Sequence, residues 1–327
     1  MMWRFLVGKG AQYALVLLVA STINFALPRL MPGSPLVLLA GEDAASLSAE
    51  DRQNLLASLG LDRPVWQQYL HYLGRLAVGD LGYSLQQGRP VAHILAERLP
   101  WTLLLVGTAL VLSTVLGVWL GAIAAWRRGR ATDLGLLGGC MLFESMPSFW
   151  LAMILIATVA AKLRWFPIFG ARTIGSGLEG LALVGNVAWH LVLPLTTLVV
   201  VSVPNVFLVM RYSMLSVLGE PYIVTARSKG LPERVILFRH VTRNALLPVA
   251  TVFMLNLGFV VGGATVIETV FSYPGVGRLL FEAVLARDYP VLQASFFVIT
   301  VSVIAANVLA DLLYPLVDPR VRRGLGV

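Results

Sequence analysis

The 327-residue chain is 57% hydrophobic and only 13% charged, with a mean hydropathy of +0.80 and a formal net charge of +8. Soluble globular domains are about 45–50% apolar, so this composition excludes a soluble protein and places the chain in a bilayer. The basic residues are dispersed and no polar domain could carry a binding face, so we exclude nucleic acid as a partner and attribute the charge to membrane topology. Cys140 is the single cysteine, which excludes a disulfide framework and a thiolate metal cluster.

Six apolar stretches are long enough to cross about 30 Å of hydrocarbon, and they predict an all-α polytopic membrane protein. They cover residues 10–30, 101–125, 134–161, 189–210, 246–270 and 291–314. The first exceeds a signal-peptide core and no Ala-x-Ala site follows it, so we favour a retained helix over a cleaved signal peptide. Pro147 predicts a kink in the third helix. Gly117 with Gly121, and Gly258 with Gly262, have the spacing that lets helices pack closely.

Between the first two helices lies the one long polar segment of the chain. We divide the chain into residues 1–30 (N-terminus and first helix), 31–100 (the polar segment), 101–314 (the transmembrane core, with a polar loop at 211–245) and 315–327 (a tail). In the polar segment, apolar residues at helical spacing predict an amphipathic helix that lies on the membrane surface or on the rest of the protein. They are Trp66, Tyr69, Leu70, Leu73 and Leu76.

Six crossings place both termini on one side of the membrane. Basic residues concentrate at the termini, at 127–130 and in the 211–245 loop, so the positive-inside rule predicts that this side is cytoplasmic. The polar segment 31–100 is then extracytoplasmic.

The most informative segment is the basic stretch at 220–248. Pro221 can occupy the first turn of a helix, and Gly230 with Pro232 should end that helix after about two turns. Ala226 and Gly230 are four residues apart, so we expect a face of small side chains that lets a partner's backbone come close. The alternative is a basic loop that only fixes topology.

Two motifs in this stretch, TARSKGL at 225–231 and RNALLP at 243–248, resemble the cytoplasmic coupling loop of ABC-importer permeases, specifically the dipeptide/oligopeptide/nickel branch. The wider family has Glu-Ala-Ala, three residues and then Gly; here Gly230 is in place, but residues 224–226 are Val-Thr-Ala and Leu-Pro comes later, as in the peptide branch. The run VIETVFSYPG at 266–275 resembles the same branch.

The resemblance implies a type I ABC importer permease fold in a bacterial cytoplasmic (inner) membrane. The implied partners are a second related permease, two ATPase subunits that bind ATP and Mg²⁺, and an extracytoplasmic solute-binding protein; no cofactor is expected in this chain itself. The residues expected to couple to the ATPases are Tyr222, Thr225, Ala226, Arg227, Lys229 and Gly230. Di- or oligopeptides are the expected substrates, although nickel, metal chelates and sugars are also carried in this branch.

Ionisable and polar residues inside the apolar stretches are candidates for the translocation path or gate, because a charge in lipid is costly. Glu144 could line the path or make a structural hydrogen bond, and Asn256 is a second path candidate. Glu268 is expected in the outer gate or in its hydrogen-bonded support. Asp311 is expected to make a contact at a helix end.

Enzyme motifs are absent from the sequence or lack their context. The GSGLEG run at 175–180 matches a dinucleotide-binding pattern but has no strand–helix unit around it, so we expect a loop. No Walker A motif is present, the four histidines have no metal-ligand spacing, and an intramembrane protease lacks support, so we expect a non-catalytic subunit. The main alternative is a self-sufficient secondary transporter or channel, whose inverted repeats we do not see.

Overall fold

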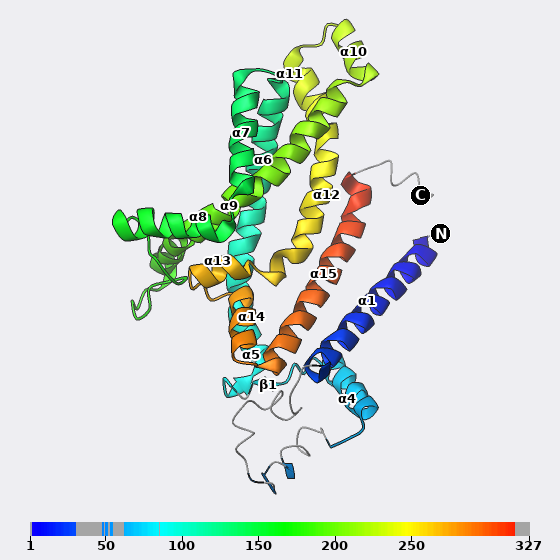
Figure 1. The fold of residues 1–327 in the computed structure, drawn as a ribbon. Helices are drawn as coiled ribbons and strands as arrows, with labels where there is room; N and C mark the ends of the chain where they lie inside the picture. Colours follow the sequence, from blue (N-terminus) through cyan, green and yellow to red (C-terminus); the bar gives the residue numbers. More distant parts are fainter. Residues whose placement is uncertain are drawn as a thin grey trace.

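The computed structural model describes residues 2–30, 48, 50–51, 53–54, 62–84 and 86–317, so the expectations for most of 31–61 and for the basic tail after residue 317 lie outside it. The described chain is a bundle of tilted helices (Figure 1). The α-helices are α1 (Met2–Leu30), α4 (Val65–Ala77), α5 (Val91–Thr102), α6 (Thr108–Trp126), α7 (Ala131–Ser145), α8 (Ser148–Leu155), α9 (Gly180–Leu218), α10 (Pro221–Ser228), α11 (Glu233–Val235), α12 (Arg243–Phe259), α13 (Thr265–Val270), α14 (Val276–Leu285) and α15 (Tyr289–Val317).

Short irregular helices join several of these elements into longer ones. Three are π-helical, η2 (Leu103–Gly107), η3 (Ile156–Lys162) and η4 (Ile236–Thr242), and η5 (Val260–Gly262) is a 3₁₀ turn. Strands β1 (Tyr83–Ser84) and β2 (Arg89–Pro90) form a small antiparallel hairpin with Tyr83 opposite Pro90. The α10 end and the α5 end lie at opposite extremes of the bundle (Figure 1).

Four helical stretches of the described chain are long and apolar enough to cross a membrane: Val91–Trp126, Gly180–Leu218, Glu233–Gly262 and Tyr289–Leu309. A fifth would be α7 with α8–η3, but these meet at an angle of 96°. The kink expected at Pro147 is therefore confirmed, and it is a sharp break between two separate helices. Met146 and Pro147 are both extended, because a proline disfavours the helical conformation of the residue before it, and α8 starts afresh in a new direction (Figure 1).

Several helices extend beyond the boundaries expected from hydropathy. The second crossing begins at Val91, the fourth runs over the 39 residues of α9 through Pro194 and Pro204, and the fifth begins at Glu233. Prolines are tolerated inside such helices because neighbouring helices and local π-turns accommodate the lost hydrogen bonds. As a result, the polar loop expected at 211–245 narrows to about 219–232, and Gly263, with φ +73°, separates α13 from the fifth helix.

Helices α6 and α9 approach most closely, at the glycine pair that the sequence predicted. A Cβ placed on Gly117 would lie 2.6 Å from Val206 Cβ, and one on Gly121 would lie 2.7 Å from the carbonyl oxygen of Phe207. This prediction is confirmed. Gly258 faces α15 with more room, since its Cβ would lie 3.7 Å from Ala306 Cβ.

Helix α1 runs antiparallel to α15 and is tied to it at both ends (Figure 1). Lys9 Nζ lies 2.9 Å from Asp311 Oδ2, and Tyr13 donates a 2.6 Å hydrogen bond to the same oxygen. At the other end Asn24 Nδ2 donates to the carbonyl oxygen of Gln293 at 2.6 Å. The expected helix-end contact of Asp311 is confirmed.

Candidate functional site

Helix α10 forms where the basic stretch predicted a two-turn helix. It begins at Pro221 in the first helical position and ends at Ser228. Gly230 follows with φ +73°, a conformation that favours glycine, so it terminates the helix as expected.

One face of α10 is built into the protein. Ile223 is fully buried and Ala226 is 7% exposed. They belong to a core, here called the α10 core, that joins α10 to α6, α9, η4 and α12. Its other buried members are Ala125, Val206, Met210, Met214, Ile236, Val241, Ala245 and Val249.

This packing corrects the expected docking face. Ala226 is covered by the chain's own core and is not available to a partner. A Cβ on Gly230 would meet nothing within 4 Å, so this glycine is needed for its backbone conformation and not for a close approach within the chain.

The other predicted coupling side chains lie on the outward face of α10 and in the turn that follows it. Tyr222, Thr225, Arg227 and Lys229 are all exposed. Asn244 of α12 donates a 3.1 Å hydrogen bond to the Tyr222 hydroxyl, and Arg227 Nε lies 3.1 Å from Glu233 Oε1 across the following turn. These two contacts fix the helix against the start of α11 and α12.

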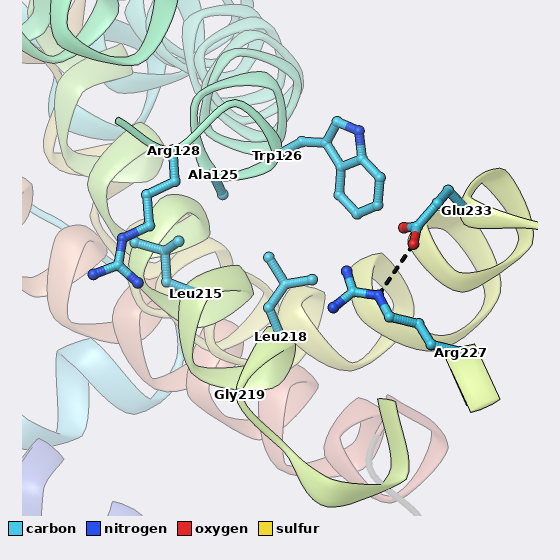
Figure 2. A pocket seen from close by; sticks show the side chains of 8 residues that line it. All are labelled: Ala125, Trp126, Arg128, Leu215, Leu218, Gly219, Arg227 and Glu233. Atoms are coloured by element: carbon cyan, nitrogen blue, oxygen red, sulfur yellow. Dashed lines mark hydrogen bonds and ion pairs between the residues drawn. The ribbon is translucent and has the colours of Figure 1, made fainter. Parts of the chain in front are cut away.

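A cavity of about 440 Å³ lies between α10 and the ends of α6 and α9 (Figure 2). Trp126 faces the Arg227–Glu233 pair on one side, and Arg128 lies on the other. Ala125, Leu215, Leu218 and Gly219 complete its lining.

The sequence did not reveal the strongest polar contact at this end of the bundle. Asp133, in the first turn of α7, is 1% exposed and accepts two hydrogen bonds from Arg211 of α9, from Nε at 2.7 Å and from an Nη nitrogen at 2.9 Å. The backbone N–H of Gly129 donates to it at 3.0 Å. From the sequence, Arg211 is expected only to contribute to membrane topology. An acidic residue at the start of an apolar stretch was the feature that could have indicated this ion pair.

At the α5 end, Glu268 of α13 is fully buried. Its carboxylate accepts a hydrogen bond from Thr102 Oγ1 at 3.0 Å and from the backbone N–H groups of Arg278 at 3.0 Å and Ala264 at 3.4 Å. Thr102 Oγ1 also accepts from the Val276 N–H at 2.8 Å. The carboxylate therefore connects α5, α13 and α14.

Glycines surround this carboxylate on three sides. A Cβ on Gly275 would lie 2.3 Å from Glu268 Cδ, and Cβ atoms on Gly263 and Gly277 would lie 2.9 Å from its oxygens. A side chain at any of these three positions would therefore displace the carboxylate or the backbone around it. Of the two roles left open for Glu268, this geometry favours hydrogen-bonded support.

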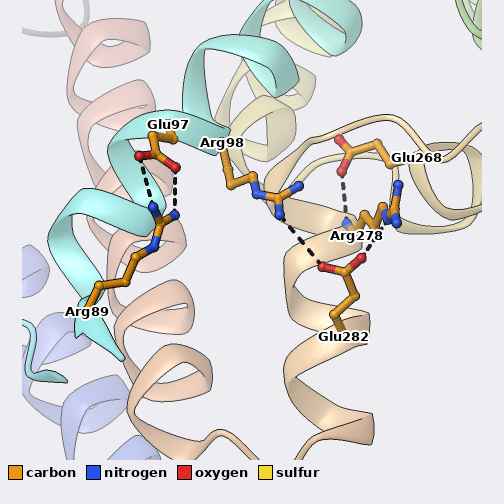
Figure 3. Close-up of polar contacts among 6 residues, drawn as sticks. All are labelled: Arg89, Glu97, Arg98, Glu268, Arg278 and Glu282. Carbon is orange, nitrogen blue, oxygen red and sulfur yellow. Dashed lines mark hydrogen bonds and ion pairs between the residues drawn. The ribbon is translucent and has the colours of Figure 1, made fainter. Parts of the chain in front are cut away.

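Charged side chains cover α5 and α14 near Glu268 (Figure 3). Glu282 accepts from Arg278 Nε at 2.7 Å and lies 3.9 Å from Arg98, while Arg89 and Glu97 pair at 2.6 Å. Arg278 thus contacts both acids, Glu268 through its backbone and Glu282 through its side chain.

The other two path candidates lie apart from this site. Glu144 on α7 and Asn256 on α12 are both exposed, and neither is among the hydrogen-bonding partners of Glu268.

An uncharged groove of about 630 Å³ lies between α9 and α12, and the sequence did not predict it. Its polar lining residues are Asn205, Tyr212, Ser213, Ser216 and Asn244. Exposed Asn205, Tyr212 and Ser216 recur at helical spacing, which was the available signal.

No group of three or more His, Cys, Asp or Glu side chains that could hold a metal occurs in the described part of the chain. In the described chain no strand directly precedes the 175–180 run, which forms a loop that leads into α9, with positive φ at Gly175, Gly177 and Gly180.

A model of the family described as binding-protein-dependent transport system inner membrane component matches residues 117–323. This chain belongs to that permease family. A second model, for the N-terminal part of such membrane components, matches residues 2–106. Together the two matched ranges include α1 and α10.

Named permeases are similar to this chain over most of their length. The dipeptide transport system permease protein DppB of Escherichia coli K12 is 38% identical over 317 residues, covering 92% of this chain and 93% of the relative. The oligopeptide transport system permease protein AppB of Bacillus subtilis is 35% identical over 307 residues, covering 94% and 95%. The di/tripeptide transport system permease protein DppB of Pseudomonas aeruginosa is 38% identical over 314 residues, covering 92% and 93%.

Proposed function

We propose that this chain is the permease subunit of an ATP-driven, binding-protein-dependent importer of di- or oligopeptides. Family membership and the dipeptide, di/tripeptide and oligopeptide permeases among its relatives support this substrate class. The observation that carries the mechanism is α10, a helix with one face in the permease core and the other exposed. The chain supplies no catalytic group; ATP and Mg²⁺ are held by partner ATPase subunits.

The proposed topology has six crossings with both termini and α10 in the cytoplasm. Helix α1 is the first crossing, α7 with α8–η3 is the third, and the four long apolar helices supply the others. The β1–β2 hairpin, α4 and the Glu268 region then lie toward the outer side, where a solute-binding protein delivers the peptide.

In the proposed mechanism, the exposed face of α10 sits on an ATPase subunit, and closure of the ATPase pair moves α10. The α10 core passes this motion to α6, α9 and α12 as one rigid unit, because its side chains pack α10 together with α6, α9, η4 and α12. A second permease completes the path, and the pair switches between inward-facing and outward-facing states.

We assign the inner part of the path to the uncharged groove between α9 and α12. The Asn205 amide can both donate and accept hydrogen bonds, as a peptide group does. The Nδ2 of Asn244 donates to Tyr222 and His240, which leaves its Oδ1 as an acceptor, and apolar residues such as Leu208 and Leu247 line the rest. Such a surface accepts peptide backbone without selecting side-chain charge.

Co-purification tests this proposal. The tagged chain, expressed with its neighbouring genes and extracted in mild detergent, should bring down a second permease and two Walker-containing ATPases by mass spectrometry. Arg227→Glu combined with Lys229→Glu should release the ATPases, whereas Arg172→Glu, an exposed charge reversal in the loop before α9, should not. Recovery of the chain alone as a homo-oligomer, even after cross-linking at Lys229, would favour a self-sufficient secondary transporter.

A further inference from the structure

Helix α4 is amphipathic, and its apolar side is only half covered. None of its residues is buried. Trp66 is 62% exposed and Leu70 is 58% exposed, and both lie on one helical face with Leu73 and Ala77. The opposite face carries His71 and Arg75.

The covered half of α4 is fastened to the end of α1 (Figure 1). The hydroxyl groups of Tyr69 and Thr22 share a 2.6 Å hydrogen bond, and Arg29 donates to Gln68 Oε1 at 2.7 Å. The Phe25 ring packs edge-on against Tyr69 with ring centroids 5.2 Å apart. These contacts hold α4 in one orientation beside α1.

The surface that α4 joins is itself apolar and exposed. On α1, Leu15, Leu18, Val19 and Ile23 are between 48% and 61% exposed, and they share a side with Thr22. In the proposed topology this side of α1 faces lipid. The apolar face of α4 therefore continues a lipid-facing surface at the point where α1 meets the outer side of the membrane.

From this continuity we infer that α4 lies in the outer interface of the bilayer, with Trp66 and Leu70 inserted at the boundary between headgroups and acyl chains. Tryptophan concentrates at this depth, and a helix with a strong apolar face and a charged opposite face binds in the interface plane. Arg75, paired with Asp80 at 2.8 Å, stays on the water side. The helix thereby anchors the outer end of α1 to the membrane surface. This inference rests on the proposed topology.

Spin labels test it in the intact complex, reconstituted in nanodiscs of phosphatidylethanolamine and phosphatidylglycerol. Because Cys140 is the single cysteine, Cys140→Ser provides a background for labels at Trp66→Cys, Leu70→Cys and, as the matched control on the polar face, His71→Cys. The accessibility of each spin label to oxygen, which partitions into lipid, is compared with its accessibility to a water-soluble nickel chelate. Labels at positions 66 and 70 should collide severalfold more with oxygen, and the label at 71 more with the chelate.

Two results would overturn the inference. If the chelate reaches a label at position 70 freely, α4 lies in water. If neither reagent reaches that label, protein covers the apolar face of α4. A label at Leu18→Cys tests the proposed topology separately. If the chelate reaches that label, α1 does not cross the membrane and the topology itself is wrong. If Leu70→Cys does not assemble, Ala77→Cys, a smaller change on the same face, gives the same comparison.

Discussion

Asp133 and Arg211, 78 residues apart in sequence, form a buried ion pair with two hydrogen bonds that fastens the start of α7 to α9. Their side chains are 2% and 11% exposed. Arg211 lies one residue after Met210, a member of the α10 core, so the pair attaches the α6–α7 turn to the unit that carries α10. We expect this ion pair to make α7 and α9 move together during transport.

Removing one partner of this pair should destabilise the protein more than removing both. Asp133→Leu leaves an uncompensated buried guanidinium, and breaking such a pair costs about 3–5 kcal/mol. The double variant Asp133→Leu with Arg211→Met should recover part of that loss. Thermal unfolding of the purified complex measures the stability of the single and double variants. If the stability losses of the two single variants add up in the double variant, the two residues are not coupled.

The close approach of α6 and α9 should not tolerate a methyl group. A Cβ on Gly121 would lie 2.7 Å from a backbone oxygen and 2.9 Å from Met210 Cβ, so Gly121→Ala must push the helices apart at a cost of about 1–3 kcal/mol. Gly138→Ala on α7, whose Cβ meets nothing within 4 Å, is the control and should stabilise slightly. Equal melting temperatures for the two variants would contradict the packing described here.

The effect of a substitution at Gly230 on stability should depend on whether the new residue adopts a positive φ, and less on the size of its side chain. Because its φ is +73° and space around it is open, Gly230→Ala should cost about 1–2 kcal/mol, and Gly230→Asn should cost less, since asparagine adopts this conformation more readily. ATPase retention on affinity resin, together with melting temperature, checks this. If Gly230→Ala is neutral and only a bulky residue such as tryptophan releases the ATPases, a partner packs directly on this glycine.

Loss of the Glu268 carboxylate should weaken the packing of α5, α13 and α14. Glu268→Ala removes the acceptor of two backbone N–H groups and the Thr102 hydroxyl, and each buried group left unsatisfied costs about 1–3 kcal/mol. Gly275→Ala should act similarly by displacing the carboxylate. Recovery of assembled complex should fall in parallel with uptake. Full assembly with uptake abolished would instead indicate a gating role for Glu268.

Stability should also depend on Asp288, which lies just before α15 and is 3% exposed. Burial raises its pKa, and the hydrogen bonds from Ser84 Oγ and the Val291 N–H offset this only in part. The folded protein then binds this proton more tightly than the unfolded chain, whose aspartate has a pKa of about 4. Its contribution to stability therefore falls as the pH rises from there through the raised pKa. Melting temperatures across this range should show a shallower fall for Asp288→Asn than for the parent chain.

Hydropathy and helix-terminating residues located α10, four of the six expected crossings and the α6–α9 contact correctly, because each depends on local sequence. Pro221, Gly230 and the Gly117–Gly121 pair act through the backbone at their own positions. The 96° turn at Pro147 exceeded expectation because a proline in an apolar stretch signals a break but not its angle.

Pairings between distant residues were beyond sequence reasoning. The Asp133–Arg211 and Thr102–Glu268 contacts join residues 78 and 166 positions apart, and no spacing rule connects them. Ala226 was assigned to a docking face because its size fits one, whereas only the tertiary packing shows that the chain's own core covers it.

ATP-driven peptide import coupled through α10 is tested most directly by uptake of a radiolabelled dipeptide into liposomes that contain the purified complex, with its solute-binding protein outside and ATP enclosed. Uptake should require ATP, persist with a proton uncoupler, and be lost in the Arg227→Glu, Lys229→Glu variant. Uptake that continues without ATP and collapses with the uncoupler would contradict the account.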